Sequence, residues 1–431
     1  MLHAARLMSS TVTTPPQVAI TGMGLVSPLG NSLATALARA RRGESGIRAY
    51  TSPWIGAAHP RLQLRVGGTV EDFDPAALLD PRLAERHEPA VLFALAAADE
   101  ALTQAGLGHG QGGDRIGCVI GSGLPGAELW HRALHASYAA DRPGDIARMT
   151  AIAITGNAAA AQLALRHGLR GPSFGLANAC ASGSTAIMLA MDQIRLGRAD
   201  AMVVGGCESS MRSLLTYASF VDAGMHVTTE AAGACAPFAA DRKGFVLAEG
   251  AAMLVLERLD LARARGAHVW GELAGAASTN DAYHVISPDP SGAAWARTMT
   301  LALAEAGVHP DEVDAISAHA TATPLGDLAE TRAIRRVFGA RADAIPVSAT
   351  KSMHGHAFGA AGALEVALAV AAMDASVVLP TINLHTPDPE CDLDYVPNTA
   401  RPHATQVLLK NSFGAGGAAT CLLIRRSRQA A

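Results

Sequence analysis

Two distant stretches of the chain share one pattern, and this repeat limits the possible folds more than any other feature. Each stretch has a strand-like run, a glycine-containing loop and an alanine-rich helical run, over 173–196 and again over 345–373. Before each one, a strand-like run enters a loop of small residues, at 116–124 and at 313–325. A unit that recurs in this way packs against its copy. The repeat therefore predicts an α/β fold of two similar lobes, packed back to back as α-β-α-β-α layers.

The remaining strand-like and helical runs alternate along the chain. Strands are expected at 17–22, 115–120, 201–204 and 252–257, and helices at 88–105 and 185–196. Such alternation is typical of a mostly parallel sheet covered on both faces. Gly22 and Gly24 indicate a turn after the first strand, but the next glycine is Gly30, so the dinucleotide-binding pattern GxGxxG fails. We expect a loose tail over 1–16, a first lobe over 17–265 and a second over 266–431.

Composition excludes several classes of protein. The net charge of −4 gives no basic surface for nucleic acid. Every apolar run is shorter than the roughly 18 residues of a membrane span. The six cysteines show neither CxxC nor metal-ligand spacing, which favours free thiols in a reducing cytoplasm over a disulfide framework.

Cys180 is the strongest candidate for a reactive group. Small and apolar residues precede it, as at the end of a buried strand, and Ser182, Gly183 and Ser184 open a helical run. A thiol at a helix N-terminus lies near unpaired N–H groups, which stabilise a thiolate and can form an oxyanion hole. The structural alternative is a packed core cysteine, because free cysteines are commonly buried.

A second candidate cluster begins at His319. The strand-like run 314–317 delivers His319 to the carboxyl edge of the sheet, where α/β proteins usually bind ligands. Thr321 and Thr323 alternate, so both hydroxyls can face one side and hydrogen-bond an amide-bearing substrate. A structural histidine followed by ordinary turn residues is the alternative.

A third cluster places Lys351, His354 and His356 in an alanine- and glycine-rich segment. A buried charge needs a partner, because an unpaired one costs several kcal/mol. The carboxylates that could pair with Lys351 are Glu365, Glu330 and Asp327. The two histidines lack a third ligand at metal-binding spacing, so no metal site is predicted.

A fourth segment, 410–417, reads Lys-Asn-Ser-Phe-Gly-Ala-Gly-Gly after a strand-like run. Closely spaced glycines let a backbone approach a ligand or act as a hinge. Alone, this signal is weak.

Taken together and in this order, the four segments resemble the β-ketoacyl-acyl carrier protein synthases, particularly the elongating, synthase II-like branch. The resemblance runs from about residue 18 to residue 424, and the stretches 241–250 and 281–284 also look familial. It implies the thiolase fold, whose two lobes match the repeat.

The resemblance also implies roles for the candidate residues. Cys180 matches the nucleophile that accepts the acyl group, and Phe413 matches a gating residue whose N–H joins that of Cys180 in the oxyanion hole. His319 and His356 match the pair that assists malonyl decarboxylation. The other matches are Lys351 with its ion-pair partner Glu365, the second acidic position Glu330, and the phosphopantetheine-binding Thr321 and Thr323.

The implied activity is an acyltransferase reaction, the decarboxylative Claisen condensation of a Cys-bound acyl chain with malonyl-acyl carrier protein, in fatty-acid elongation. It needs no metal or other cofactor. The implied partner is an acyl carrier protein, and the implied assembly is a homodimer or a heterodimer with a chain-length factor. The alternative pathway is a specialised polyketide or aryl-polyene route.

Two other classes of protein share this fold. A non-catalytic chain-length factor typically lacks the nucleophilic cysteine, so Cys180 argues against it. A coenzyme A-dependent thiolase needs a second catalytic cysteine, and neither Cys391 nor Cys421 lies in a matching motif.

The sequence departs from the family pattern at three places, of which Ala415, in place of a bulky phenylalanine, points to altered chain selectivity. They are Ala320 and Ala322 within the motif that begins at His319, Ala415 in the gate loop where the family has phenylalanine, and the sequence Gly-Leu-Pro-Gly at 123–126. The sequence leaves the acyl chain length and the carrier protein open.

Overall fold

The computed structural model describes residues 15–51, 66–108, 112–139, 141–146, 148–227 and 233–427. The expected tail over 1–16 lies outside these ranges except for its last two residues.

Ten strands form one large sheet, and five of them come from each half of the chain. The order along the sheet is β10-β9-β13-β14-β8-β1-β7-β6-β4-β5. The first half supplies β1 (Val18–Val26), β4 (Ile116–Gly121), β5 (Ser173–Leu176), β6 (Ala201–Glu208) and β7 (Gly250–Arg258). The second half supplies β8 (Gly271–Asn280), β9 (Ala315–Ser317), β10 (Val347–Ser348), β13 (Val407–Phe413) and β14 (Ala418–Arg425).

The two sets of five strands have the same topology, which confirms the duplication. In the first, β1, β7 and β6 pair antiparallel in turn, and β6, β4 and β5 pair parallel. In the second, β8, β14 and β13 pair antiparallel, and β13, β9 and β10 pair parallel. The sets join only where Val18–Ile20 of β1 meets Gly271–Leu273 of β8. We propose that each set with its helices forms one lobe, with the boundary at 265/266.

The prediction of a mostly parallel sheet was wrong, because the sheet is mixed. A parallel pair needs a long crossover, whereas the four residues 414–417 between β13 and β14 can only turn the chain back antiparallel.

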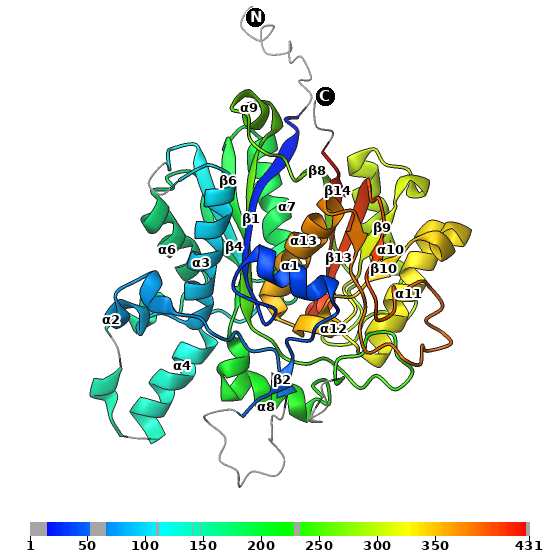
Figure 1. The fold of residues 1–431 in the computed structure, drawn as a ribbon. Coiled ribbons are helices and arrows are strands. Elements are labelled where there is room, and N and C mark those ends of the chain that lie inside the picture. Colours follow the sequence, from blue (N-terminus) through cyan, green and yellow to red (C-terminus); the bar gives the residue numbers. More distant parts are fainter. Residues whose placement is uncertain are drawn as a thin grey trace, which may run out of the picture.

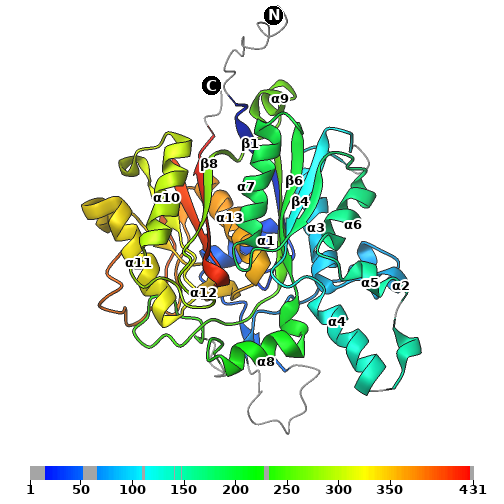
Figure 2. The same ribbon diagram turned by 180° about the vertical axis from the view of Figure 1, so that it is seen from behind.

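Helices form three layers around the two sets of strands, as predicted (Figures 1 and 2). The middle layer holds α7 (Ser182–Arg195) and α13 (Phe358–Asp374), which pack on each other and on strands of both halves. One outer layer holds α3 (Pro89–Gln104) and α6 (Ala158–His167), and the other holds α10 (Ala293–Ala306) and α11 (Pro324–Phe338). The smaller helices are α1 (Leu33–Arg41), α2 (Pro81–Ala84), α4 (Ala127–Leu134), α5 (Thr150–Ala153), α8 (Leu214–Asp222), α9 (Leu259–Ala264) and α12 (Lys351–His354).

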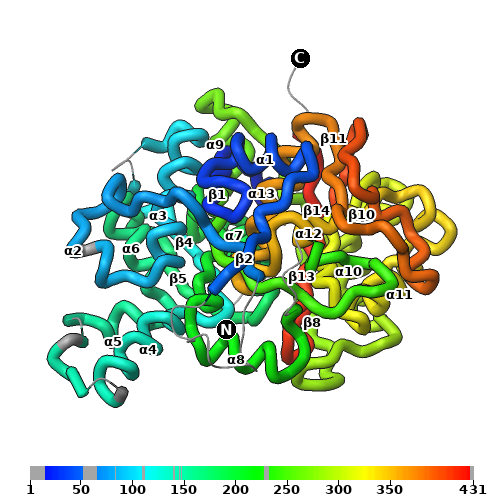
Figure 3. The backbone as a smooth tube through the Cα atoms, turned by 60° about the horizontal axis from the view of Figure 1, so that its bottom comes forward, coloured from blue at the N-terminus to red at the C-terminus, as the bar shows by residue number. Residues whose placement is uncertain are grey.

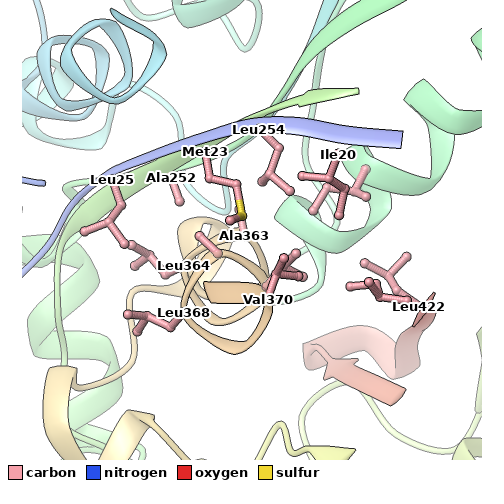
Figure 4. Packing of buried hydrophobic residues seen from close by; sticks show 14 of the residues in the cluster. Ile20, Met23, Leu25, Ala252, Leu254, Ala363, Leu364, Leu368, Val370 and Leu422 are labelled. Carbon is pink, nitrogen blue, oxygen red and sulfur yellow. The ribbon is translucent and has the colours of Figure 1, made fainter. Parts of the chain in front are cut away.

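The largest core cluster lies around the middle layer. Ile20, Met23 and Leu25 of β1 point at α13, where Leu364 and Val370 meet them (Figure 4). Alanine and glycine dominate α13, and small residues fill the first turn of α7, so the two helices can lie close together between the two sets of strands.

Gly22 and Gly24 were predicted to form a turn, but they lie inside β1. They occupy the opposite face of this strand, against α3. A Cβ atom at Gly22 would lie 2.0 Å from the carbonyl oxygen of Ala101, and one at Gly24 would lie 2.2 Å from that of Ala97. Glycine is therefore required by the close approach of the helix rather than by a turn.

We expect Gly22→Ala to lower the free energy of unfolding by about 3 kcal/mol, because β1 and α3 must separate to admit the methyl group. Urea unfolding followed by circular dichroism measures this change. Gly113→Ala is the matched control, since a Cβ there meets no atom within 4 Å. Equal stability of the two variants would contradict this account of the β1–α3 contact.

Candidate active site

The nucleophile candidate lies where the sequence placed it, at the start of α7. Cys180 follows β5 and comes just before Ala181, the N-cap residue of that helix. Ala179 holds a left-handed backbone conformation with φ +46°, which aims the next residue into a cavity of about 280 Å³. Cys180 therefore opens onto a cavity and is not a packed core residue.

The resting thiol is neutral, contrary to the expected thiolate. Burial raises the pKa of Cys180 to about 12, although the Lys351 ammonium and the backbone N–H of Ala415 act in the opposite direction. Desolvation of the charged form outweighs the helix N-terminus here. The thiol must therefore lose its proton to a nearby base when it reacts.

Two histidines lie beside this thiol in the same cavity. His319, in the loop after β9, and His356, just before α13, place their ring centroids 5.6 Å apart at an angle of 85°. Burial, together with the positive charge of Lys351, lowers the pKa of both imidazoles well below the ordinary value. Both rings are therefore neutral at physiological pH, and each can donate or accept one proton.

Lys351 of α12 fixes the orientation of His319. Its ammonium donates to the carbonyl oxygen of His319 at 2.5 Å and lies 3.5 Å from ring Nδ1. An ammonium has no acceptor, so Nδ1 accepts and the proton of this ring resides on Nε2. Among the three candidate carboxylates, Glu365 of α13 forms the ion pair with Lys351.

The two other carboxylates hold backbone rather than Lys351. Glu330 accepts from the backbone N–H groups of His319 and Ala320 at 2.9 and 2.8 Å. Asp327 accepts from the N–H groups of Phe238 and Ala322. Both carboxylates thus hold the loop that carries His319.

The two threonines line the same cavity on its outer side. The hydroxyls of Thr321 and Thr323 lie 3.0 Å apart, so the alternation of the sequence does bring them to one side. Their suggested contact with phosphopantetheine stays a prediction.

The glycine-rich loop after β13 forms another wall of the cavity. Gly414 donates to Ala418 in the β13–β14 ladder, so the neighbouring N–H of Phe413 points to the opposite edge of β13. The N–H that approaches the Cys180 thiol belongs to Ala415. The oxyanion role of Phe413 stays a prediction, and Ala415 is a further backbone donor beside the thiol.

The sequence reasoning missed several residues that shape the site. Trp295 of α10 stacks on Phe413 with ring centroids 3.9 Å apart. Glu208, at the end of β6, accepts from the N–H groups of Gly123 and Gly359 and thus joins two walls of the cavity. An acidic residue that ends an apolar strand was the available signal for Glu208.

A cluster of aromatic side chains lines the side of the cavity next to His356. Phe220 stacks on Phe358 with centroids 4.9 Å apart, and Phe245 meets Phe358 edge to face. Leu124 lies on the same cavity. Large apolar side chains therefore surround the space beside the thiol, which suits a hydrocarbon chain.

Within the described ranges, no three His, Cys, Asp or Glu side chains gather in an arrangement that could hold a metal ion. Every helix in those ranges is too short or too polar to span a bilayer.

Comparison with known families identifies the family and the fold. The model of the beta-ketoacyl synthase N-terminal domain matches residues 16–262, and that of the C-terminal domain matches residues 270–385. The chain belongs to the beta-ketoacyl synthase family. Its members are condensing acyltransferases, so the chain is an enzyme of this class.

Individual relatives agree with this assignment along almost the whole chain. The 3-oxoacyl-[acyl-carrier-protein] synthase 2 of Staphylococcus aureus is 36% identical over 415 residues, which cover 95% of this chain and 98% of that protein. A ketosynthase structure, solved with its type II polyketide acyl carrier protein and a bound hexaketide, is 33% identical with a TM-score of 0.87 and covers 96% of this chain and 100% of that one. The ishigamide ketosynthase/chain length factor is 31% identical, also with a TM-score of 0.87 and the same coverage.

Proposed function

We propose that this synthase extends acyl chains in fatty-acid elongation, by condensing a Cys180-bound acyl group with malonyl-acyl carrier protein. One observation carries the proposal: the thiol of Cys180 and the imidazoles of His319 and His356 share one cavity with apolar walls. The 36% identity to a 3-oxoacyl-[acyl-carrier-protein] synthase 2 supports the elongation pathway.

In the first step the thiol of Cys180 attacks the thioester carbonyl of the acyl-carrier protein. The imidazole of His356 accepts the thiol proton, because Nδ1 of His319 faces the Lys351 ammonium and its Nε2 already carries a proton. A base is needed because the pKa of this thiol is about 12. The backbone N–H groups of Ala415 and Cys180, which lie beside the thiol, donate to the carbonyl oxygen as negative charge develops on it. The carbon–sulfur bond to the carrier breaks, the carrier thiolate takes the proton, and the acyl group remains on Cys180.

In the second step the malonyl group loses carbon dioxide. The carbon–carbon bond breaks, and its electron pair forms an enolate whose oxygen accepts hydrogen bonds from the Nε2–H of His319 and from His356. These donors stabilise the transition state more than the neutral thioester. The enolate carbon then attacks the acyl carbonyl, and Cys180 leaves as the thiolate, which takes a proton from solvent.

We also propose that the enzyme acts as a dimer in the cytoplasm. The edge strand β5 exposes Phe174, and α4 and α5 project from the same half of the molecule (Figure 3). The exposed hydrophobic residues on and around these two helices include Trp130, Leu134, Tyr138, Ile146, Met149 and Ile152. Such a patch beside an open strand edge is typical of a protein interface. All six cysteines are free thiols, in keeping with a reducing compartment.

The test is elongation by the purified chain, supplied with malonyl-carrier protein and carrier-bound acyl groups of different lengths. We expect the 3-oxoacyl product extended by two carbons to form without another subunit. Activity that appears only after a chain-length factor is added would replace fatty-acid elongation with the specialised polyketide or aryl-polyene pathway.

A further inference from the structure

A second buried lysine, Lys410, lies behind the catalytic cavity and has no part in the reaction described above. It is the fourth residue of β13, after Val407, Leu408 and Leu409, and its side chain is fully buried. Its ammonium lies 2.8 Å from Oε2 of Glu365, while Lys351 pairs with Oε1 of the same carboxylate. Two buried cations therefore share one carboxylate.

This lysine also connects the two sides of the active site. On one side, Glu365 forms an ion pair with Lys351, and the Lys351 ammonium donates to the carbonyl oxygen of His319. On the other side, the Lys410 ammonium lies 3.3 Å from the hydroxyl of Ser412, which lies 2.8 Å from the hydroxyl of Ser184 in the first turn of α7. That turn begins directly after Cys180.

The next residue of the strand supports the same arrangement. Asn411 donates from its side chain to Glu330 at 3.0 Å, and Glu330 holds the backbone of His319. Phe413 then reaches the cavity itself. Lys410, Asn411 and Phe413 of β13 thus contact Glu365, Glu330 and the cavity, respectively.

We propose that Lys410 is a positioning residue for the condensation: it holds Glu365 opposite Lys351 and adds a second positive charge behind the two imidazoles. The proposal rests on the proposed function, because it concerns the proton that His356 must accept from Cys180. A charge this well buried acts strongly on its neighbours, since little solvent screens it.

The charges around this cluster determine the expected direction of the effect. The groups that act on the two histidines are Lys351 of α12, Lys410 of β13, His354 of α12 and the histidines themselves. The groups that act on Lys410 are Glu365 of α13, Lys351 and Glu330 of α11. Both lysines lower the pKa of the imidazoles, because a positive neighbour disfavours the imidazolium form. Removal of the Lys410 charge must therefore raise the pKa of the imidazoles.

The experiment is the pH profile of Cys180 acylation by acyl-carrier protein, followed by intact-protein mass spectrometry. An imidazolium cannot accept the thiol proton, so the acid limb reports the pKa of the pair. In Lys410→Met we expect this limb to move to higher pH by about one unit. Lys410→Gln removes the charge but can still donate to Glu365, and we expect the same shift.

Ser412→Ala is the matched control, because it removes the hydroxyl contact and keeps the charge. We expect its acid limb to coincide with that of the unaltered enzyme. Should Lys410→Met fail to fold, Lys410→Gln decides the question. A rate that falls by the same factor at every pH in the variants would overturn the proposal, whereas an unaltered enzyme that is not acylated at all would instead refute the proposed function.

Discussion

Cys180→Ala is expected to abolish both acyl loading and chain extension, with a loss of at least about 10³-fold, as for other enzymes that lose their nucleophile. The cavity offers no other cysteine to carry the acyl group. The fold should persist, because alanine fits the site and Ala179, which holds the strained backbone, is unchanged. Intact-protein mass spectrometry after incubation with acyl-carrier protein measures the loading directly.

Cys118→Ala is the control for this experiment. Cys118 is buried on β4 against α6, away from the cavity, and its thiol donates to the carbonyl oxygen of Ala160. We expect this variant to load normally. Acylation that persists in Cys180→Ala would mean that another group carries the chain.

The second large effect is expected for the histidine pair. His319→Ala and His356→Ala each remove one donor to the enolate oxygen, and loss of one such donor costs about 10²- to 10³-fold in rate. Loading of Cys180 should suffer less, because backbone N–H groups beside the thiol, rather than the imidazoles, stabilise the carbonyl oxygen in that step. Release of carbon dioxide from malonyl-carrier protein and acylation of Cys180 measure the two steps separately.

His354→Asn serves as the comparison for these variants. His354 is equally buried, but its Nε2 lies 3.1 Å from the Thr350 hydroxyl and its ring does not line the cavity. We expect both steps to survive in this variant. An equal loss of loading and of decarboxylation in His319→Ala and His356→Ala would argue against the division of labour proposed here.

The sequence predicted the parts of the fold that depend on local pattern. The repeat and the strand-like runs implied two similar sets of strands with helical layers, because buried strands and helices differ in length and period. The antiparallel direction of β13 and β14 follows from the short loop between them. A general α/β pattern does not encode this loop length. The glycines of β1 were misread because their reason, the backbone of α3, lies about 75 residues away.

The candidate site, too, was predicted only in the part that depends on local sequence motifs. The motifs named Cys180, His319, His356 and Lys351, and the structure brings all four to one place. Burial decided what the motifs could not, since it makes the thiol neutral despite its position at a helix N-terminus. Lys410 went unnoticed as a partner of Glu365, although a lysine within an apolar strand already required a buried anion.

The most direct test of the central claim is a single turnover of the purified enzyme with acyl-carrier protein and isotopically labelled malonyl-carrier protein. Mass spectrometry should first detect the acyl group on the peptide that contains Cys180. The 3-oxoacyl-carrier protein, with two labelled carbons, should then appear as the acyl-enzyme disappears. A product that forms with no acyl group ever found on Cys180, or an acyl-enzyme that malonyl-carrier protein never discharges into product, would contradict the account.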